Sequence, residues 1–433
     1  MDILRFITAG SVDDGKSTLI GRLLYDTKSI LADQMEAIER ASKTRGDGEI
    51  DLALLTDGLR SEREQGITID VAYKYFQTPN RKFISIDAPG HIQYTRNMVT
   101  GASNADLAII LIDARLGVVE QTRRHSLIAS LLGIPHIVVA VNKMDLVGYS
   151  EDTFLQIAQD YKSLADKLGI KDLKIIPVSA LAGDNIVDKS EAMSWYTGET
   201  MLHFLENVNV LNDLNLTDAR MAVQYVLRPQ TEELHDYRGY AGRIQSGVFK
   251  KGDTITVLPS EQTSKIAKIE VYGEEVEEAT APQSVTILLE TDVDISRGDL
   301  ISGTGNAPEL SQDIEAIVCW MDDRKELKVG NKYTLQHGTS LVRCSVRGIE
   351  YRIDVNNYEQ LEDIQSLKLN DIAKISLRTA KPLAYDSYLK NRANGAAILI
   401  DETSHVTVGA VIGSTAFGGK QTTGFVFVNV ISI

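Results

Sequence analysis

Residues 10–17 have the types and the spacing needed to hold phosphate groups. They read GSVDDGKS, which fits G-x-x-x-x-G-K-[ST], and they stand between the strand-like run ILRFITA and a helical stretch. Glycines let consecutive backbone N–H groups point at phosphate oxygens, and the N-terminus of the helix adds positive potential. The lysine charge suits the β- and γ-phosphates, and the serine hydroxyl is a hard ligand for Mg²⁺. The predicted phosphate-binding loop comprises Gly10, Ser11, Val12, Asp13, Asp14, Gly15, Lys16, Ser17 and Thr18.

A second element, D-x-x-G, is informative only through its position. It occurs at 87–90, 145–148 and 236–239, and only the first copy follows a buried strand, KFISI. There Asp87 would lie at the end of the strand and contact Mg²⁺ through a water molecule, while the Gly90 N–H could reach the γ-phosphate. The other two copies are interpreted as turns.

A third element selects the base. Asn142, Lys143 and Asp145 form N-K-x-D directly after the apolar run HIVVAV. A carboxylate in the last position can accept hydrogen bonds from the ring N–H and the exocyclic amine of guanine, whereas adenine offers no such edge. The Lys143 stem can lie over the ring. With the first two elements in this order, the sequence predicts a domain that binds GTP together with Mg²⁺.

These segments must be positioned by a sheet whose strands end at one edge. Up to about residue 208, strand-like runs alternate with helical patterns, which indicates an α/β sheet covered on both faces. IDVAYKYF and RKFISI, separated by the turn TPN, predict a hairpin, so that the sheet is mostly parallel with one antiparallel strand. The segment 27–65 is long for a loop and should carry a helix of its own. The other expected strands are ILRFITA, LAIILI, IVVAV and KIIPV, and the helices lie near 16–26, 92–102, 118–132 and 150–168.

Beyond a polar bridge at 207–220, helical periodicity disappears. Short alternating runs follow at intervals of about ten residues, with turn residues between them, which is typical of antiparallel barrels or sandwiches. A second join falls near 302–313. The predicted fold class is therefore multidomain α/β plus all-β: a P-loop GTPase domain over 1–215, followed by two antiparallel β-barrels over 216–308 and 309–433.

The composition excludes other classes of protein. Sixty acidic residues against 45 basic ones give a net charge of −15, which argues against a generally basic nucleic-acid binder. The longest apolar runs are about half the length of a membrane-spanning helix, and the first ten residues lack the features of a signal peptide. Cys319 and Cys344 stand in strand-like runs and are expected to be buried small apolar side chains. A cytoplasmic protein without a membrane segment is expected.

EREQGITID (62–70), DAPGH (87–91) and NKMD (142–145) resemble the translation-factor class of GTPases, the elongation factor Tu group. Two β-barrels after the GTPase domain match the architecture of that class. The resemblance implies that Thr68 closes on Mg²⁺ when GTP is bound, and that His91 positions or polarises the attacking water.

Further matches to this class lie around the same motifs. Asp13 corresponds to the acid of the phosphate-binding loop, and Val12 and Ile67 match an apolar pair that gates the histidine. In such domains a closing segment supports the base-binding carboxylate through its serine, and one of its backbone N–H groups meets the guanine carbonyl. In this sequence that segment is Ser179, Ala180 and Leu181.

The departures point to another branch. Translation factors usually read G-H-V-D-H-G-K, whereas Ser11 and Asp14 stand here at the histidine positions. GSVDDGKST and the stretch from DLALLTDGL to DVAYKYF closely resemble the GTPase subunit of bacterial sulfate adenylyltransferase, ATP sulfurylase subunit 1. In that family the GTPase pairs, in heterodimers or assemblies of them, with a smaller catalytic subunit. That subunit makes adenosine 5′-phosphosulfate and pyrophosphate from ATP and sulfate, and GTP hydrolysis drives the uphill reaction.

The sequence fits this division of labour. It carries one P-loop and neither an H-x-G-H nor an S-G-G-x-D-S motif, so adenylylation is expected on the partner. GGKQ at 418–421 fails the P-loop pattern, so this sequence is expected to lack a fused adenylylsulfate kinase domain, either by nature or by truncation. No motif identifies an arginine finger in cis, so slow intrinsic hydrolysis is expected. The alternative is a translation elongation factor that carries aminoacyl-tRNA; its RNA contacts would include Arg238, Arg243, Lys250 and Lys251, which are equally readable as hairpin surface.

Overall fold

The structure is a computed structural model that describes residues 2–30, 52, 70–91, 95–210, 213–229 and 236–414. The chain forms two compact units that divide near residue 210. Ile67 and Thr68 lie outside the described residues, as does most of the segment 27–65 for which a helix is predicted.

The first unit is built on a six-stranded sheet in the order β2-β3-β1-β4-β5-β6. All neighbours are parallel except β2 and β3, which form the predicted hairpin. β4 and β5 are buried along their whole length, which explains why their sequences read as continuous apolar runs. The strands are β1 (Ile3–Ala9), β2 (Ala72–Gln77), β3 (Lys82–Asp87), β4 (Leu107–Asp113), β5 (His136–Asn142) and β6 (Asp172–Pro177).

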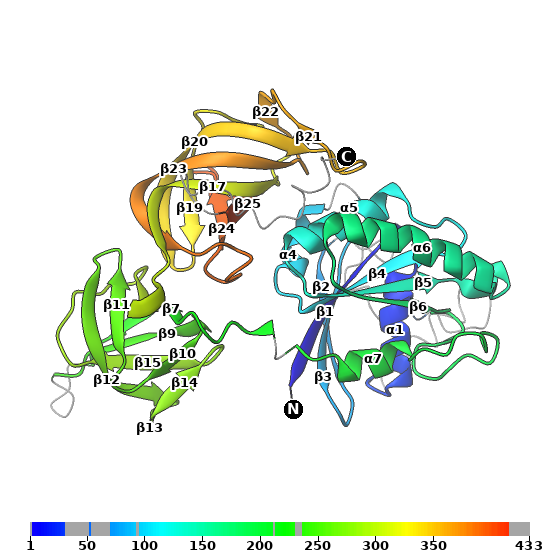
Figure 1. Ribbon diagram of the computed structural model, residues 1–433, viewed down its shortest axis with the longest axis horizontal. Coiled ribbons are helices and arrows are strands. Elements are labelled where there is room, and N and C mark those ends of the chain that lie inside the picture. Colours follow the sequence, from blue (N-terminus) through cyan, green and yellow to red (C-terminus); the bar gives the residue numbers. More distant parts are fainter. Residues whose placement is uncertain are drawn as a thin grey trace. The chain divides into compact units, whose positions relative to one another are not determined.

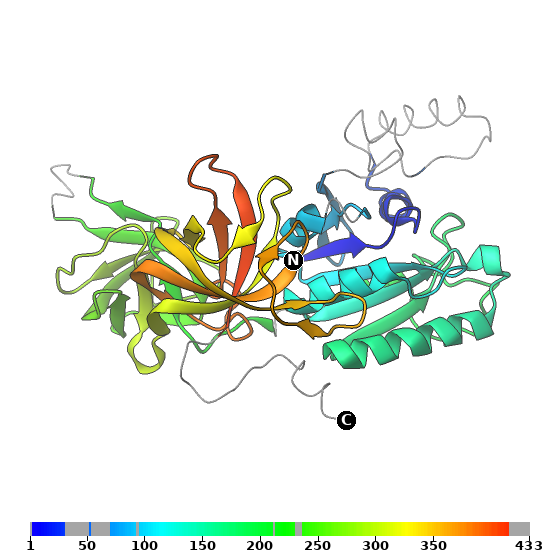
Figure 2. The same cartoon turned by 90° about the horizontal axis from the view of Figure 1, so that it is seen from above.

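Helices cover both faces of this sheet (Figure 1). Leu4 and Phe6 of β1 pack in one cluster with Leu19 and Leu205, so the helices that carry the latter two share a face. Figure 2 shows blue α1 and green α6 on opposite sides of the strands. The short α7 was not predicted, because seven residues give too little periodicity to recognise. The helices are α1 (Lys16–Asp26), α4 (Thr95–Ala102), α5 (Glu120–Leu131), α6 (Glu151–Leu168), α7 (Met201–Asn207) and the 3₁₀ turn η3 (Met144–Val147).

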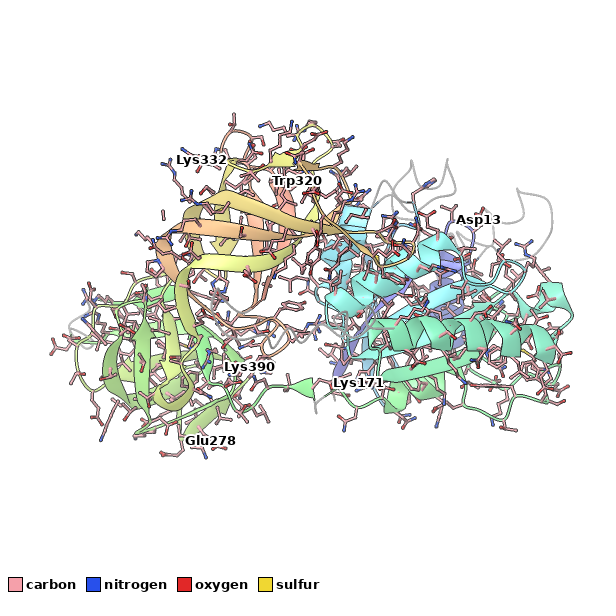
Figure 3. The ribbon with its side chains drawn as sticks, turned by 45° about the horizontal axis from the view of Figure 1, so that its top comes forward. Asp13, Lys171, Glu278, Trp320, Lys332 and Lys390 are labelled. Atoms are coloured by element: carbon pink, nitrogen blue, oxygen red, sulfur yellow. The ribbon has the colours of Figure 1, made fainter. Side chains whose placement is uncertain are left out.

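The second unit begins with an antiparallel barrel. The strands β11-β16-β7-β9-β15-β12 form a ring that closes through pairing of β12 with β11. Figure 3 shows Glu278 on β14, which pairs with β10 beside this ring. The strands are β7 (Arg220–Ala222), β8 (Tyr225–Leu227), β9 (Gly239–Ser246), β10 (Val248–Lys250), β11 (Thr254–Leu258), β12 (Gln262–Val271), β13 (Glu274–Val276), β14 (Glu278–Thr280), β15 (Ser284–Leu289) and β16 (Leu300–Gly303).

A second antiparallel barrel follows. Its ring β19-β24-β25-β17-β23-β20 closes through pairing of β20 with β19. Trp320, labelled in Figure 3, is fully buried in the core, and its indole N–H donates to the Lys325 carbonyl at 2.8 Å. Cys344 is buried in the same core, and burial raises the pKa of its thiol to about 12. The strands are β17 (Glu309–Trp320), β18 (Leu327–Lys328), β19 (Lys332–His337), β20 (Ser340–Ile353), β21 (Gln360–Leu361), β22 (Ser366–Leu367), β23 (Ile372–Tyr385), β24 (Ala396–Ile400) and β25 (Thr407–Ser414).

The fold class is thus confirmed, while single elements differ from the predictions. The run at 221–227 is split into β7 and β8, and the run at 240–249 is split at Gly247, whose φ of 75° breaks the strand. The polar bridge at 207–220 is buried at its C-terminal end. Its last residues include Asp218 and Arg220, which are 5% and 0% exposed.

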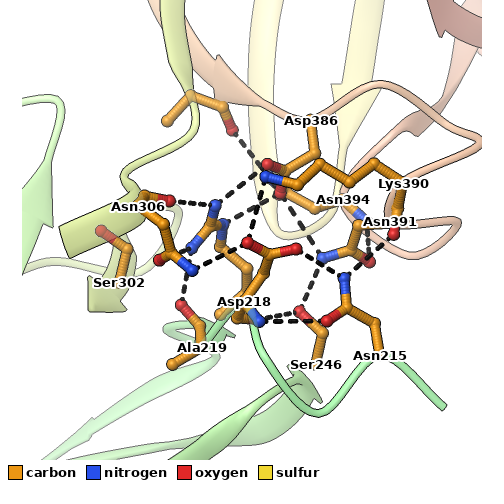
Figure 4. A network of polar contacts seen from close by, with 12 residues as sticks. Asn215, Asp218, Ala219, Ser246, Ser302, Asn306, Asp386, Lys390, Asn391 and Asn394 are labelled. Atoms are coloured by element: carbon orange, nitrogen blue, oxygen red, sulfur yellow. Dashed lines mark hydrogen bonds and ion pairs between the residues drawn. The ribbon is translucent and has the colours of Figure 1, made fainter. Parts of the chain in front are cut away.

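Arg220 joins the two barrels through Ala219, Asn306 and Asp386, three partners that Figure 4 labels. Its Nε and one terminal nitrogen donate to the two carboxylate oxygens of Asp386 at 2.9 and 3.0 Å, from β7 to the segment after β23. The other donors reach the carbonyl of Ala219 at 2.9 Å and that of Asn306 at 2.6 Å. Asn394 Nδ2 donates to Asp386 at 2.9 Å. The ion pair is therefore buried but well provided with hydrogen-bond partners, as a buried charge requires.

Within the part of the chain that the structure describes, no helix is both long and apolar enough to cross a membrane.

Candidate nucleotide-binding site

The segment between β1 and α1 has the backbone of a phosphate-binding loop. Gly15 precedes α1 with φ 90°, and a Cβ there would meet Asn142 Nδ2 at 2.5 Å. Only glycine fits that conformation and that close approach. Gly10 is similarly confined, since its Cβ would meet Asp14 Oδ2 at 2.9 Å. Asp13, labelled in Figure 3, is exposed with φ 66°.

Asp14 has a role in the loop that its spacing alone does not reveal. Its buried carboxylate accepts a hydrogen bond from the Ser11 N–H at 2.5 Å, which closes the loop on itself. Burial raises the pKa of Asp14, against the opposing effect of nearby Lys16. Asp14 stands at a sequence position where translation factors usually have a histidine. In this chain a carboxylate therefore makes the hydrogen bond that closes the loop.

Lys16 lies against its own loop. Its ammonium donates to the carbonyls of Gly10 at 3.1 Å and Ser11 at 2.7 Å, and the side chain is buried. Burial lowers the pKa of Lys16, while Asp87 and Asp14 act in the opposite direction. A phosphate group entering the loop would therefore meet a buried cation that is positioned by backbone oxygens.

Two hydroxyl groups orient the carboxylate of Asp87 at the end of β3. Ser17 Oγ donates to one oxygen at 3.0 Å and Thr8 Oγ1 to the other at 3.0 Å, and Asp87 is only 1% exposed. Ser17 and Asp87 together present hard oxygen atoms beside the loop, which is the donor chemistry that Mg²⁺ prefers. The residues present thus fit the metal. Thr8 was not predicted, because its partner lies 79 residues away.

Gly90 is wedged against the phosphate-binding loop. A Cβ there would meet Lys16 Nζ at 2.6 Å and the Gly10 carbonyl at 2.8 Å, so a larger residue would displace the lysine. The next residue, His91, is exposed and lines a cavity that opens beside the loop. The structure thus brings the D-x-x-G segment and the predicted water-positioning histidine next to the loop.

Asn142, at the end of β5, ties two loops together. Its Nδ2 donates to the Asp14 carbonyl at 2.8 Å, and its Oδ1 accepts from the Ala180 N–H at 2.9 Å. Lys143 has φ 63° and forms an ion pair with Asp113 at 2.9 Å. The Lys143 stem is thereby held beside the cavity, and Asp145 lies on the following 3₁₀ turn.

Asp113 and Arg115 were missed by the sequence reasoning. Arg115 donates to both carboxylate oxygens of Asp113, at 3.0 and 2.6 Å. Although burial opposes it, the hydrogen bonds from Arg115 and Lys143 hold the pKa of Asp113 well below its usual range. Arg115 also lines the cavity, and its only sequence signal is a position two residues after the end of a buried strand.

These residues surround one cavity of about 510 Å³, a volume suited to a nucleotide. Gly10, Ser11, Asp14 and Asp87 lie outside its lining and accept hydrogen bonds from the lining residues Lys16, Asn142 and Ser17. Leu146 and Leu181 are each 56% exposed and supply apolar surface at the end near Asp145. The predicted residues in the lining are Val12, Asp13, Gly15, Lys16, Ser17, Thr18, Gly90, His91, Asn142, Lys143, Asp145, Ser179, Ala180 and Leu181.

Three family models match successive parts of the chain. The Elongation factor Tu GTP binding domain matches residues 1–221, Elongation factor Tu domain 2 matches 240–302, and the GTP-eEF1A C-terminal domain-like model matches 313–412. The match to a solved structure of Sup35 complexed with GDP covers 96% of this chain and 95% of that chain, at 21% identity and a TM-score of 0.44.

Curated relatives match nearly the whole chain. The Sulfate adenylyltransferase subunit 1 of Bacteroides thetaiotaomicron is 52% identical over 95% of this chain and 86% of its own length, and that of Cellvibrio japonicus is 51% identical over 98% and 89%. The Bifunctional enzyme CysN/CysC of Mycobacterium tuberculosis is 52% identical over 94% of this chain but 66% of its own length, so the chain spans about two-thirds of that protein. The GTP-binding domain, the two barrels and these identities confirm the predicted resemblance: the chain belongs to the sulfate adenylyltransferase subunit 1 family of GTPases.

Proposed function

We propose that the chain is the GTP-hydrolysing subunit of a sulfate adenylyltransferase. In this proposal it couples GTP hydrolysis to the synthesis of adenosine 5′-phosphosulfate and pyrophosphate, which a smaller partner subunit makes from ATP and sulfate. The observation that carries it is a nucleotide-sized cavity, built from the GTP-binding motifs, in a chain about half identical to subunit 1 proteins. We further propose a cytoplasmic location, where both nucleotides are available.

The proposed GTP site has a base end and a phosphate end. Asp145 accepts two hydrogen bonds from guanine, with the Lys143 stem over the ring and the Ser179–Leu181 segment beside it. At the phosphate end, the loop N–H groups and Lys16 compensate the charge that develops during phosphoryl transfer. Gly90 presents its N–H to the γ-phosphate.

The proposed metal ligands are Ser17 and Thr68, with Asp87 acting through water. When bound there, Mg²⁺ would neutralise charge on the β- and γ-phosphates. His91 orients the attacking water from the mouth of the cavity. Asp13 lies on the exposed edge of the loop, where it can contact groups that approach the phosphates. Arg115 is held by Asp113, which restricts its use as a catalytic cation.

Carriage of aminoacyl-tRNA has less support. The bases considered as RNA contacts have acidic or carbonyl partners on the first barrel. Arg238 pairs with Asp292 at 3.3 Å, Lys251 with Glu275 at 2.7 Å and Lys250 with Glu278 at 3.1 Å. Arg243 donates to the Pro282 carbonyl at 3.2 Å. Binding a phosphate backbone would require these pairs to open. No observation on the described residues favours the alternative.

The test is GTP hydrolysis by the chain purified with the subunit that accompanies it. Addition of ATP plus sulfate should accelerate GTP hydrolysis and yield adenosine 5′-phosphosulfate, whereas either compound alone should do neither. If the two substrates have no effect but ribosomes stimulate hydrolysis, the proposed coupling is wrong and the elongation-factor alternative holds.

A further inference from the structure

Helix α5 carries a buried polar pair that the proposed mechanism does not use. Gln121 is 8% exposed and His125 is 1% exposed, and the two lie one turn apart on the same side of the helix. Gln121 Nε2 lies 3.0 Å from the Gly90 carbonyl oxygen and 3.4 Å from His125 Nε2. The pair therefore connects the interior of α5 with the peptide that precedes His91.

The contacts define the role of each atom. The Gly90 carbonyl can only accept, so the Gln121 amide nitrogen faces it as the donor. The second N–H of that nitrogen points to His125 Nε2, which must accept and therefore carries no proton. Burial, with the positive charges of Lys16 and Arg124, lowers the pKa of His125 to about 3, which keeps the ring neutral.

Two other atoms of the pair lack partners. Gln121 Oε1 and His125 Nδ1 are buried and make no hydrogen bond in the described part of the chain. A buried polar atom without a partner costs free energy, so apolar side chains would be the more stable filling of this space. The pair nevertheless makes one hydrogen bond outside α5, from Gln121 to the Gly90 carbonyl.

That hydrogen bond holds a peptide with little freedom. Lys16 and Gly10 confine Gly90 on its other side, because they leave no room for a Cβ at this position. Its carbonyl shares one rigid plane with the N–H of His91. A donor that fixes the carbonyl therefore also fixes the plane from which the His91 side chain projects.

We propose that Gln121, oriented by His125, is a positioning residue that fixes the Gly90–His91 peptide for GTP hydrolysis. The inference rests on the proposed function of the cavity and extends the hydrolytic machinery to α5. Because Gln121 is not part of the lining of the cavity, it acts through Gly90 and His91, and the rate of hydrolysis should depend on it far more than the affinity for GDP.

Four variants test this role, each assayed with the accompanying subunit, ATP and sulfate. Gln121→Ala removes the donor, and Gln121→Glu turns a carboxylate toward the Gly90 carbonyl. Both should lower the kcat of GTP hydrolysis by about ten- to a hundredfold, the scale of a misplaced catalytic group, while the Kd for GDP changes less than about twofold. His125→Gln keeps an acceptor near the position of Nε2 and should retain most of the kcat, whereas His125→Ala should not.

Ser126→Ala is the matched control on the same helix. It removes a buried 2.8 Å hydrogen bond to Tyr161 on α6 and should leave kcat unchanged. The inference is overturned if both Gln121 variants keep kcat within about twofold of the parent, or if the Kd for GDP rises as far as kcat falls, which would make Gln121 a packing residue. A parent chain that binds neither GDP nor GTP would instead overturn the proposed function itself.

Discussion

Single side chains in the cavity divide the recognition of the nucleotide between them. Asp145 is the residue assigned to the guanine edge, and it lies at the cavity wall on the turn after β5. Asp145→Asn replaces an acceptor with an amide that also donates, so it should mismatch guanine and match xanthine, which carries an oxygen in place of the amine. We expect the Kd for GDP to rise at least about a hundredfold and that for xanthosine diphosphate to fall.

Titration calorimetry measures the Kd for GDP and the Kd for xanthosine diphosphate. Asp166→Asn on the exposed side of α6 makes the same change of charge away from the cavity and should leave both affinities unchanged. Equal weakening of both nucleotides by Asp145→Asn would show that Asp145 supports the loop without reading the base.

Asp87 should make GDP binding and GTP hydrolysis depend on Mg²⁺. Asp87→Asn retains the shape but removes the charge beside Ser17, and it leaves one of two donor hydroxyls facing an amide N–H. We expect addition of EDTA to weaken GDP binding by the parent chain and to have little effect on the variant, while GTP hydrolysis by the variant falls by about a hundredfold or more. A variant whose GDP affinity still depends on Mg²⁺ would remove Asp87 from the metal site.

At the scale of elements, α5 links the stability of the first unit to pH. The pKa of His125 is about 3 in the folded chain against 6.5 for an unburied histidine. Below pH 6.5 the unfolded chain therefore binds a proton that the folded chain does not, so stability is full above this pH and is lost as the pH falls. From pH 7.5 to 5.5 the loss attributable to His125 should be about 1.4 kcal/mol.

Urea unfolding of the parent and of His125→Gln at the two pH values isolates this contribution as a difference. Trp195, whose indole donates to the Tyr149 carbonyl, reports on the first unit once Trp320→Phe removes the other tryptophan. The variant should lose about 1.4 kcal/mol less than the parent. If the parent and the variant lose the same stability between pH 7.5 and 5.5, His125 takes up its proton equally well in the folded and the unfolded chain.

The elements also show what sequence reasoning can reach. The loop from Gly10 to Ser17 was predictable because its chemistry is packed into eight neighbouring residues between a strand and a helix. Gln121 gave no such signal, since its partner Gly90 lies 31 residues away and is brought close only by packing of α5 on the sheet. Continuous apolar runs likewise predicted β4 and β5. They could not predict the break between β9 and β10, which depends on the positive φ of Gly247.

On the scale of the whole molecule, the order of domains followed from changes of periodicity, but the contact of Arg220 with Asp386 between the barrels did not. Arg220 stands in a segment that reads as a polar linker, and nothing local marks its partner Asp386, 166 residues further on. A charged residue is normally taken as exposed. The complete burial of Arg220 is tolerated because Asp386 supplies the counter-charge and two carbonyl groups accept its other N–H groups. Residues of this kind are out of reach for pattern-based prediction.

The Arg220–Asp386 pair should therefore make the two barrels unfold together. Arg220→Met leaves a buried carboxylate without its counter-charge and should cost about 3–5 kcal/mol, as should Asp386→Leu for the opposite reason. Arg220→Met combined with Asp386→Leu removes both charges and should recover most of that loss.

Urea unfolding, followed through buried Trp320 in a Trp195→Phe background, measures these changes in the second barrel. Arg343→Met with Glu402→Leu is a matched exposed pair in the second barrel and should change stability by less than about 1 kcal/mol, singly or together. Recovery in the buried double variant would show that charge complementarity joins the barrels, because both single losses would then come from an unpaired buried charge. Additive losses would show instead that the hydrogen bonds to Ala219, Asn306 and Asn394 hold the join, and the ion pair would be secondary.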